Sequence, residues 1–470
     1  MIFEKPTHTA PGKPTGASKF PPEEVREDWV PKEDYTSVEF AELERKYLWP
    51  RIWQVACREE DLPKTGSFVT YEILDESVIV TRTAEGEIKA YNNACLHRGR
   101  RLTEGEGKTP KFVCKFHGWS WNLQGENIRV VDVEDWGPCL AQKDMSLHEF
   151  KVGIWGGFVF INMDPDCESF ETFLGDIPQR LNCLEFEKQR YRWYISVEVE
   201  CNWKTAQEAF HEAYHVQTTH RGLAPYQDSR SDGSVVHGRH GHLQKSLLQE
   251  PVIGRYVGGS GLADQRLAFL ESIRVNCRGV GSIITDQELQ AAHRILTELP
   301  ETATWMEAAV KGYEFMKEAA IASGVGYPDV SRHQMQEIGN VCTIFPNTSN
   351  VLASPINGLW YRFRPTPDND PNHCIFELFS LERFTPGSEP KVEKQIFKNW
   401  RDCKAMPSFL LEDFANIPDV QRGMRTKFFK AARTNPVLER IISNMHEQLR
   451  QFIQEGIEAE RGADGSSDAG

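Results

Sequence analysis

The spacing of hydrophobic residues changes along the chain and predicts different secondary structures in different regions. Residues 38–50 carry apolar side chains at helical spacing and end at Pro50, so we predict a helix there. Between residues 53 and 163, short alternating stretches such as FVTYEIL, SVIVTRT and GFVFINM are separated by Gly, Asn and Pro. This alternation is typical of antiparallel β-strands joined by long loops, and it predicts an all-β domain.

Strand-like and helix-like patterns occur together from about residue 166. The predicted strands are RWYISVEVECNW, GLWYRFRP and CIFELFSLERF, and helical spacing is found at about 203–216, 262–275, 286–299, 301–321, 392–406 and 408–416. A mixture of this kind within one segment favours an α+β domain. We interpret the long stretch from about 223 to 340 as a partly helical insertion, in which His237, His240 and His242 lie in a solvated loop.

We therefore predict four parts in the 470-residue chain: an N-terminal arm and helix (1–50), an all-β domain (51–165), an α+β domain (166–455) and a disordered tail (456–470). The longest apolar run, Val152–Ile161, is too short to span a bilayer. The first twenty residues contain no apolar core of a secretory signal. The expectation is a cytoplasmic protein that does not bind membranes.

Composition narrows the class of partner. The formal net charge is −14 at pH 7, and no Lys- or Arg-rich face with interleaved aromatic residues is present, so nucleic-acid binding is not expected. The eleven cysteines form no regular framework, and an odd number suits thiols and metal ligands better than disulfides. Two of them, Cys95 and Cys114, occur in patterns that indicate metal binding.

Each of these two cysteines is closely followed by a histidine. Residues 95–97 read Cys-Leu-His and residues 114–117 read Cys-Lys-Phe-His, so each loop supplies one thiolate and one imidazole. Zinc sites usually take two cysteines from one loop. A [2Fe–2S] cluster with two thiolates on one iron and two imidazoles on the other requires the mixed pattern. A zinc ribbon remains the alternative.

The runs ACLHRGRRL and CKFHGWSWNLQG resemble the Rieske proteins. This resemblance implies a [2Fe–2S] cluster bound by Cys95, His97, Cys114 and His117. Gly99 and Gly118 would let the two loops fold closely over it. Imidazole ligands raise the reduction potential from about −400 mV to roughly −150 to +300 mV, which suits a centre that accepts electrons from a ferredoxin or flavin donor.

Residues 201–220, CNWKTAQEAFHEAYHVQTTH, form a second cluster of candidate ligands. His211, Glu212 and His215 spell H-E-x-x-H, which on a helix places two histidines one turn apart beside a glutamate base, as in zinc proteases. The longer metzincin pattern fails at its two remaining positions. A zinc protease is kept as an alternative from a different enzyme class.

A second interpretation uses His215 and His220 as the metal ligands. Five residues on an ideal helix are about 140° out of phase, so these side chains share a metal only if the helix ends or distorts between them. Thr218 and Thr219 are β-branched, which favours such a break. Glu212 lies three residues before His215, a spacing that allows a hydrogen bond between the two side chains.

A resemblance to the ring-hydroxylating oxygenases supports this second interpretation. Their catalytic domains carry Asn-Trp-Lys, an acidic residue, Tyr-His and then a second His, as residues 202–220 do here. The resemblance implies that His215 and His220 bind iron and that Glu212 connects this iron to His117, a cluster ligand, of a neighbouring subunit. The family usually has Asp at this bridge, so Glu212 adds one methylene, and Ala209 replaces an Asn that is common shortly before it.

Two histidines need a carboxylate to form the facial triad that leaves positions on Fe(II) open for O₂. In the family this ligand lies on a late helix, in a pattern of acidic residues followed by Asn, and residues 411–416, LEDFAN, fit that pattern. We choose Asp413 as the third ligand, with Glu412 and Asp419 as fallbacks.

The resemblance also implies an α+β fold in which an all-β Rieske domain precedes a helix-grip catalytic domain with an antiparallel sheet. It implies an oxygenase component that takes electrons from an NAD(P)H-dependent reductase, a ferredoxin or both, and that forms a homotrimer or a hetero-hexamer with a small subunit. Between Cys95 and Trp119, six basic residues against two acidic ones indicate a docking patch for an acidic donor. Hydrogen bonds from these residues to loop carbonyls explain them equally well.

Our first hypothesis for the reaction is dihydroxylation of an aromatic substrate. The second is monooxygenation or oxidative demethylation of an aromatic or alkylammonium compound. A non-catalytic Rieske electron carrier is a third, which the second metal motif opposes. Phe210, Phe345, Trp360 and Phe363 are aromatic candidates for the pocket wall, although core packing is the more common fate of such residues.

Overall fold

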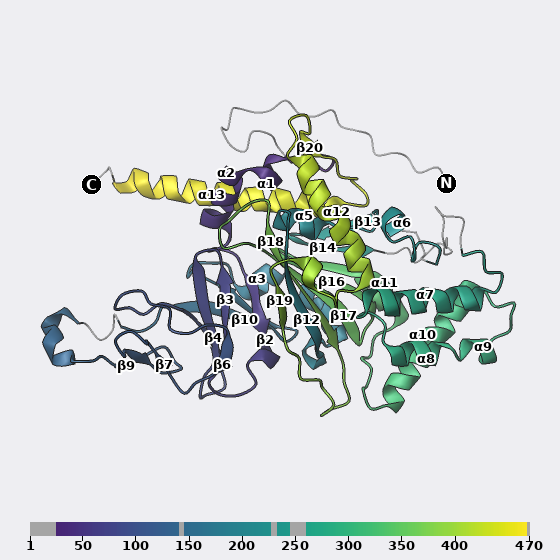
Figure 1. The fold of residues 1–470 in the computed structure, drawn as a ribbon, viewed down its shortest axis with the longest axis horizontal. Coiled ribbons are helices and arrows are strands. Elements are labelled where there is room, and N and C mark those ends of the chain that lie inside the picture. Colours follow the sequence, from purple (N-terminus) through teal and green to yellow (C-terminus); the bar gives the residue numbers. More distant parts are fainter. Residues whose placement is uncertain (1–24, 141–144, 227–232, 245–259, 468–470) are drawn as a thin grey trace.

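The computed structural model describes residues 25–140, 145–226, 233–244 and 260–467. Residues 1–24 of the predicted N-terminal arm lie outside this part. Two β-sheets dominate the described chain, one on the left and one at the centre of Figure 1, with helices above and to the right of the central sheet. The domain boundary predicted at residue 165 falls between the last strand of the first sheet and the first strand of the second.

The first sheet has seven strands in the order β2-β11-β10-β5-β4-β3-β6, and a separate three-stranded sheet, β7-β8-β9, lies at the left end of the molecule in Figure 1. The predicted alternation is seen in part of β3 and β10, where buried and more exposed side chains follow each other, while all five residues of β2 and of β11 are buried. Their bounds are β2 Gln54–Arg58, β3 Ser67–Ile73, β4 Glu76–Arg82, β5 Ile88–Asn92, β6 Glu106–Lys108, β7 Phe112–Val113, β8 Ser120–Trp121, β9 Asn127–Arg129, β10 Glu149–Trp155 and β11 Phe158–Asn162.

The second sheet has eight strands in the order β13-β14-β15-β16-β17-β18-β12-β19. Its neighbours are antiparallel except for β12 and β19, which run parallel, so the predicted antiparallel sheet is mixed at one edge. The bounds are β12 Arg190–Val199, β13 Gly233–His237, β14 His240–Gln244, β15 Val341–Ile344, β16 Thr348–Ser354, β17 Asn357–Pro365, β18 Cys374–Glu382 and β19 Gln395–Phe397.

The two sheets share one hydrophobic core and buried hydrogen bonds from an arginine to backbone carbonyls. Phe158 on β11 packs against Trp360 on β17, with ring centroids 4.5 Å apart. Arg362, also on β17, donates from Nη1 to the carbonyls of Val55 and Ala56 on β2, at 2.7 and 2.8 Å. A guanidinium that satisfies backbone carbonyls of the other domain fixes the orientation of the two domains.

The helices fall into two groups around the second sheet. The first group follows β12 and β19 and carries the candidate iron ligands: α5 Trp203–Glu208, α6 Val216–Thr219 and α12 Ser408–Met424. The second group lies at the right of Figure 1: α7 Gln265–Val280, α8 Asp286–Ala292, α9 Ile295–Glu298, α10 Trp305–Ala322 and α11 Arg332–Ile338. In the described part of the chain, no helix is both long and apolar enough to cross a membrane.

Elements near the two ends of the chain lie side by side above the sheets in Figure 1. The short strands β1 Val30–Pro31 and β20 Ala431–Ala432 pair with each other. The N-terminal helices α1 Glu33–Thr36 and α2 Val38–Leu43, with the π-helical turn Glu44–Leu48, pack against the C-terminal helix α13 Arg440–Ser467. The helix predicted at 38–50 is confirmed by α2 and the π-helical turn.

Two short helices, α3 Phe170–Leu174 and α4 Ile177–Leu181, connect the two sheets.

Two predicted helices are wrong in part. Residues 392–406 contain β19 and a short 3₁₀ turn instead, because the backbone of β19 pairs with the edge of β12. The helix predicted at 203–216 is interrupted between α5 and α6. Local spacing alone does not show either effect, since both depend on what the segment meets in the folded chain.

Two predictions for irregular segments are also corrected. The insertion predicted from 223 begins with the hairpin β13–β14, which extends the main sheet, and His240 and His242 are buried there rather than solvated. The tail predicted from 456 is helical as far as Ser467, because Ile453 and Ile457 pack against the N-terminal helices and prolong α13. Residues 468–470 lie outside the described residues.

Candidate metal centres

Two loops at the tip of the first domain are built in the same way. In the first, the Gly99 N–H donates to the carbonyl of Cys95 at 2.8 Å, and in the second the Gly118 N–H donates to the carbonyl of Cys114 at 2.9 Å. Both glycines have positive φ, 73° and 75°. Residues with a Cβ rarely adopt this conformation, so each turn requires the glycine that follows its Cys–His pair.

The four residues predicted to bind the cluster meet between these loops. The thiols of Cys95 and Cys114 are close enough to influence each other's ionisation, and the rings of His97 and His117 lie 4.6 Å apart between centroids. The Nδ1 atom of His97 is buried and has no hydrogen-bond partner among the described residues. A buried polar atom without a partner is costly unless it binds a metal, so this set of two thiols and two imidazoles fits a [2Fe–2S] cluster.

Electrostatics around the tip favour the ligand forms of Cys114 and His117, whereas burial raises the pKa of the Cys95 thiol. Burial opposes ionisation of Cys114, but the N–H groups of Phe116 and His117 lower the pKa of its thiol overall. Partial desolvation and the nearby charges of His97 and Arg98 lower the pKa of the exposed His117, which favours its neutral imidazole. Thiolate and neutral imidazole are the forms that bind iron.

Three candidate ligand atoms of the second centre form a compact triangle. His215 Nε2 lies 3.3 Å from His220 Nε2, and Asp413 Oδ1 lies 3.3 Å from His220 Nε2 and 3.8 Å from His215 Nε2. Within the described residues this is the one group of three or more His, Cys, Asp or Glu side chains that is close enough to share an ion. Two imidazoles and one carboxylate on one face of a metal are the donor set of non-haem Fe(II) oxygenases.

A carboxylate contacts the outer nitrogen of each histidine. His215 Nδ1 lies 2.7 Å from Glu212 Oε1, and His220 Nδ1 lies 2.7 Å from Glu412 Oε2. Each carboxylate accepts a hydrogen from Nδ1, so both Nε2 atoms are left to bind a metal. Burial lowers the pKa of each imidazole, but the surrounding carboxylates raise it overall, as expected where the site is built for a cation.

The short helix α6 lets His215 and His220 face the same point although they are five residues apart in the sequence. His215 precedes Val216, the first residue of α6, and His220 follows its last residue with φ −94° and ψ 65°, which is not helical. The helix therefore ends between the two ligands, as the five-residue spacing predicts, and both rings turn to the same side. This break between the two histidines confirms the geometric condition set by the sequence.

The same geometry contradicts the zinc-protease alternative. His211 and His215 do not share a helix, because α5 ends at Glu208 and α6 begins at Val216. His211 is fully buried, and it does not belong to the triangle of ligand atoms. The H-E-x-x-H run is therefore a coincidence of spacing within a bent segment.

Helix α12 explains the choice among the three acidic candidates. Its buried face carries Phe409, Leu410, Asp413, Phe414 and Ile417, and Asp413 is the one carboxylate in this apolar row. Asp419 is exposed and pairs with Arg422 at 2.8 Å, which removes it as a fallback.

Glu412, the other fallback, orients His220 instead of joining the triangle, a contact that sequence reasoning missed. The helical periodicity of α12 is the sequence signal that separates it from Asp413. A charged residue on the apolar face needs a partner, whereas one on the adjacent face does not.

Comparison with known proteins agrees with both centres. Residues 52–138 match the Rieske [2Fe-2S] domain, and residues 185–455, more than half of the chain, match the ring hydroxylating alpha subunit catalytic domain. The chain belongs to the ring-hydroxylating alpha subunit family. This membership implies a Rieske [2Fe–2S] cluster and a mononuclear non-haem iron, held by an all-β Rieske domain and an α+β catalytic domain.

Relatives of this alpha subunit act on two different kinds of compound. It is 30% identical over 198 residues to the anthranilate 1,2-dioxygenase large subunit of Acinetobacter baylyi, a match over 41% of this chain and 42% of that protein. It is 28% identical over 221 residues to the carnitine monooxygenase oxygenase subunit of Escherichia coli, over 46% and 58% of the two chains. The chain thus spans about half the length of the curated relatives that it matches.

Solved structures share the fold over nearly the whole alpha subunit. A quaternary ammonium Rieske monooxygenase in complex with L-carnitine has a TM-score of 0.61 and 17% identity, covering 91% of this chain and 96% of that one. Naphthalene 1,2-dioxygenase from Rhodococcus sp. bound to indole has a TM-score of 0.59 and 19% identity, covering 90% and 94%. At this level of identity the likeness concerns the fold alone.

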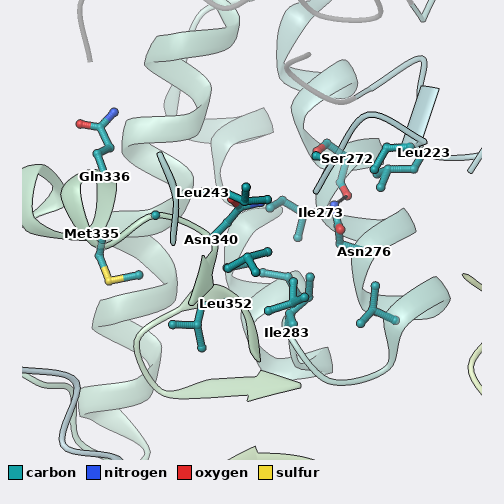
Figure 2. Close-up of a pocket in the computed structure, with 18 of the residues that line it drawn as sticks. Leu223, Leu243, Ser272, Ile273, Asn276, Ile283, Met335, Gln336, Asn340 and Leu352 are labelled. Atoms are coloured by element: carbon teal, nitrogen blue, oxygen red, sulfur yellow. Dashed lines mark hydrogen bonds between the residues drawn. The ribbon is translucent and has the colours of Figure 1, made fainter. Parts of the chain in front are cut away.

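A pocket of about 530 Å³ reaches the three ligand atoms of the alpha subunit. Figure 2 shows Leu243, Ile273 and Leu352 around it, with Asn340 among them. Most of the wall is aliphatic or aromatic, and helices α7, α10 and α11 supply much of it. Such a pocket suits a mostly apolar small molecule that is held beside an iron.

The four aromatic candidates for this wall have different fates. Phe210 lines the pocket, while Phe345, Trp360 and Phe363 are buried in the hydrophobic core and do not border it. Core packing was the expected fate of most of them. Only the folded chain shows that Phe210, five residues before His215, faces the cavity.

Proposed function

We propose that this alpha subunit dihydroxylates an aromatic substrate with O₂ and with electrons that enter through the Rieske cluster. The observation that carries the proposal is the triangle of His215, His220 and Asp413 at the wall of an apolar pocket. An iron in that triangle would supply open positions for O₂. Cys95, His97, Cys114 and His117 would hold the cluster that stores the second electron.

The charges of the pocket favour a substrate without a positive charge. Apart from the ligands and Glu212, the charged residues of the wall are Glu314 and Lys317. Glu314 is exposed and pairs with Lys311 at 2.7 Å, so it is not a buried counter-ion for an ammonium group. Lys317 lies over the ring of Tyr327, and it forms no ion pair within the described ranges. A lysine facing the cavity repels a cation.

Oxidation of an alkylammonium substrate is the second candidate. It is supported by the similarity to the carnitine and glycine betaine monooxygenase oxygenase subunits. The aromatic rings in the wall, including Phe269, Trp305 and Tyr313, provide faces that attract quaternary ammonium groups. Replacing a neutral aromatic probe by a trimethylammonium probe of similar size distinguishes the two candidate functions. Turnover falls if the substrate is a neutral aromatic compound, and it does not fall if the substrate is an alkylammonium compound.

Glu212 is proposed as the link through which electrons reach the iron. Its Oε1 contacts His215, and the neighbouring Tyr214 is 65% exposed, so this side of the iron site lies at the surface. His117 is exposed at the Rieske tip. The tip and the helix α6 lie at opposite sides of Figure 1. These positions support a ring of three chains, in which the cluster of one chain serves the iron of the next.

The electron donor is proposed to be a ferredoxin, a flavin reductase or both, ultimately reduced by NAD(P)H. The basic residues that surround the tip are all exposed. The acidic Glu106 forms an ion pair with Lys394 at 2.9 Å. A basic rim around an electron-accepting centre attracts an acidic protein. The presence of a small subunit and the cytoplasmic location both stay predictions.

Metal and sulfide analysis of the purified protein tests this function most directly. We expect about three irons and two sulfides per chain, with the absorption bands of a Rieske cluster. A single zinc without sulfide would contradict the proposal.

A variant separates the two centres. His220→Ala should lose the mononuclear iron and all product from an aromatic probe such as naphthalene, while the cluster spectrum stays unchanged. His211→Ala serves as the matched control, since His211 lies outside the triangle. Full activity of His220→Ala would disprove the assignment of the second centre.

A further inference from the structure

A histidine of the C-terminal helix is held between two carboxylates behind the iron site. His446, on α13, is completely buried, with Nδ1 at 2.8 Å from Asp34 Oδ2 and Nε2 at 2.7 Å from Glu208 Oε1. Asp34 belongs to α1 and Glu208 is the last residue of α5. One side chain therefore ties together three elements that are far apart in the sequence.

Two further residues complete this buried network. The Tyr35 hydroxyl donates to Glu208 Oε2 at 3.1 Å, and Arg450 forms an ion pair with Asp34. Each nitrogen of His446 faces a carboxylate, so both nitrogens carry hydrogens and the ring is positively charged. Two carboxylates then balance two cations, which allows the group to be buried at low cost.

The titration of His446 agrees with this geometry. Burial opposes the charged ring, but the hydrogen bonds to Asp34 and Glu208 outweigh it and raise the pKa of His446. The neighbouring His211 shows the opposite effect, because burial and the charge of His446 lower its pKa to about 3. His211 is therefore neutral, and His446 carries the positive charge of this region.

Glu208 stands at the start of the bend that presents Glu212. The carbonyl of Glu208 accepts the N–H of His211 at 3.0 Å, which forms the turn after α5. Glu212 follows His211 directly and contacts the ligand His215. Other contacts also restrain this bend: Phe210 packs against Phe376, and the N–H of His215 donates to Glu212 Oε2 at 3.0 Å. Glu208 adds the restraint from the side of the terminal helices, because its carboxylate holds the end of α5 against His446.

We propose that His446 is a positioning residue that holds the end of α5 through Glu208. This keeps Glu212 in contact with His215, in the place from which it is proposed to pass electrons to the iron. This inference rests on the bridging role proposed for Glu212. It gives the two terminal helices a function in electron transfer, because α1 and α13 supply the partners that fix Glu208. Without the imidazolium, Glu208 and Asp34 become buried like charges, and the end of α5 moves outward to hydrate them.

The first test measures hydrogen exchange of residues 209–214 in His446→Gln. We expect exchange there to rise about tenfold or more, while exchange of the central strands stays unchanged. His240→Gln is the matched control, since His240 is equally buried and hydrogen-bonded to the Phe173 carbonyl but lies in the sheet. Wild-type protection of 209–214 in His446→Gln would overturn the proposal even if the variant melts at a lower temperature.

The second test measures electron transfer itself. Dithionite-reduced enzyme is mixed with O₂ and naphthalene, and the cluster absorbance reports its reoxidation. We expect a rate about tenfold to a hundredfold lower in His446→Gln, with iron content kept, as for loss of other outer-sphere contacts. Slow reoxidation in Glu212→Gln combined with a normal rate in His446→Gln would overturn the inference alone. A normal rate in Glu212→Gln would contradict the bridge, and the exchange experiment then decides on His446.

Two further measurements cover the case in which His446→Gln does not fold. Glu208→Gln keeps a hydrogen-bonding group at the same place and should reproduce the exchange phenotype. In the wild type, protection of 209–214 should fall as the pH rises through the raised pKa of His446, after correction for intrinsic exchange. The charged groups that face His446 are Asp34, Glu208 and, more distantly, Arg450. Protection that does not change with pH would count against the network.

Discussion

His220 Nε2 and Asp413 Oδ1 lie 3.3 Å apart, although one residue ends the short helix α6 and the other lies in the middle of α12. Neither helix presents a complete set of ligands, so the candidate iron site forms only when α12 packs against the segment after α5. The apolar neighbours of Asp413, Phe409 and Phe414, provide that packing. The hydrophobic face of α12 therefore determines the position of the third candidate ligand, Asp413.

Replacing Asp413 should remove the mononuclear iron without harming the cluster. In Asp413→Ala the two remaining imidazoles hold Fe(II) weakly, so we expect iron to fall to the two atoms of the cluster and oxygenase turnover to be lost. Iron analysis and the Rieske absorption spectrum check both parts. Retention of the third iron would mean that another carboxylate completes the site.

Replacing Glu412 should weaken the iron site less severely. Glu412→Gln keeps the shape of the side chain but removes the charge that holds the Nδ1 hydrogen of His220, so Fe(II) affinity should fall about tenfold to a hundredfold. A competition titration with an iron chelator measures this change. Asp419→Asn is the control, since Asp419 lies on the same helix but pairs only with Arg422, and it should bind iron as the wild type does.

Charge reversal at the Rieske tip tests where the electron donor docks. Lys108 and Lys111 are both exposed, and Lys108→Glu with Lys111→Glu should lower donor-supported turnover at low salt, with a smaller effect at high salt. The double variant Lys398→Glu and Lys404→Glu is the control on the catalytic domain. Equal turnover of the two double variants at low ionic strength would place the donor elsewhere.

The contact between the two domains should be a major source of stability. Arg362 bonds to Glu377 and to two carbonyls of β2, all in the protein interior. Removing one partner of such a buried pair costs about 3–5 kcal/mol, so Arg362→Leu should unfold at clearly lower urea concentration. Arg422→Leu, at an exposed ion pair, should change stability by about 0–1 kcal/mol.

The same contact predicts a dependence of stability on pH. Burial raises the pKa of Glu377, but Arg362 and Arg364 outweigh it and hold this pKa well below its usual value. A carboxylate with a lowered pKa stabilises the fold above its unfolded pKa, and this contribution is lost as the pH falls towards the folded value. Acid unfolding of the wild type should therefore be steeper than that of Glu377→Gln, which circular dichroism at decreasing pH can measure.

Patterns of period two and the two metal motifs could be read directly from the sequence. Strands such as β3 and β10 were found because part of each alternates between buried and more exposed positions, whereas β17 and β18 are buried almost throughout. The cluster loops were found because one Cys and one His occur in each. The spacing of His215 and His220 even required a break in the helix between them, which α6 provides. These features depend on residues close together in the chain, where local geometry decides the structure.

Contacts between distant segments could not be read in this way. The sequence by itself determined the ligand types, their loops and the need for a carboxylate, but only the tertiary structure decided that Asp413 completes the triangle and that Glu412 orients His220. The tertiary structure alone also decided three further features: the parallel strand β19, the helical tail and the buried partners of His446. In each case the free energy comes from burying surface against a partner that is remote in the chain, and spacing along the sequence carries no information about that partner.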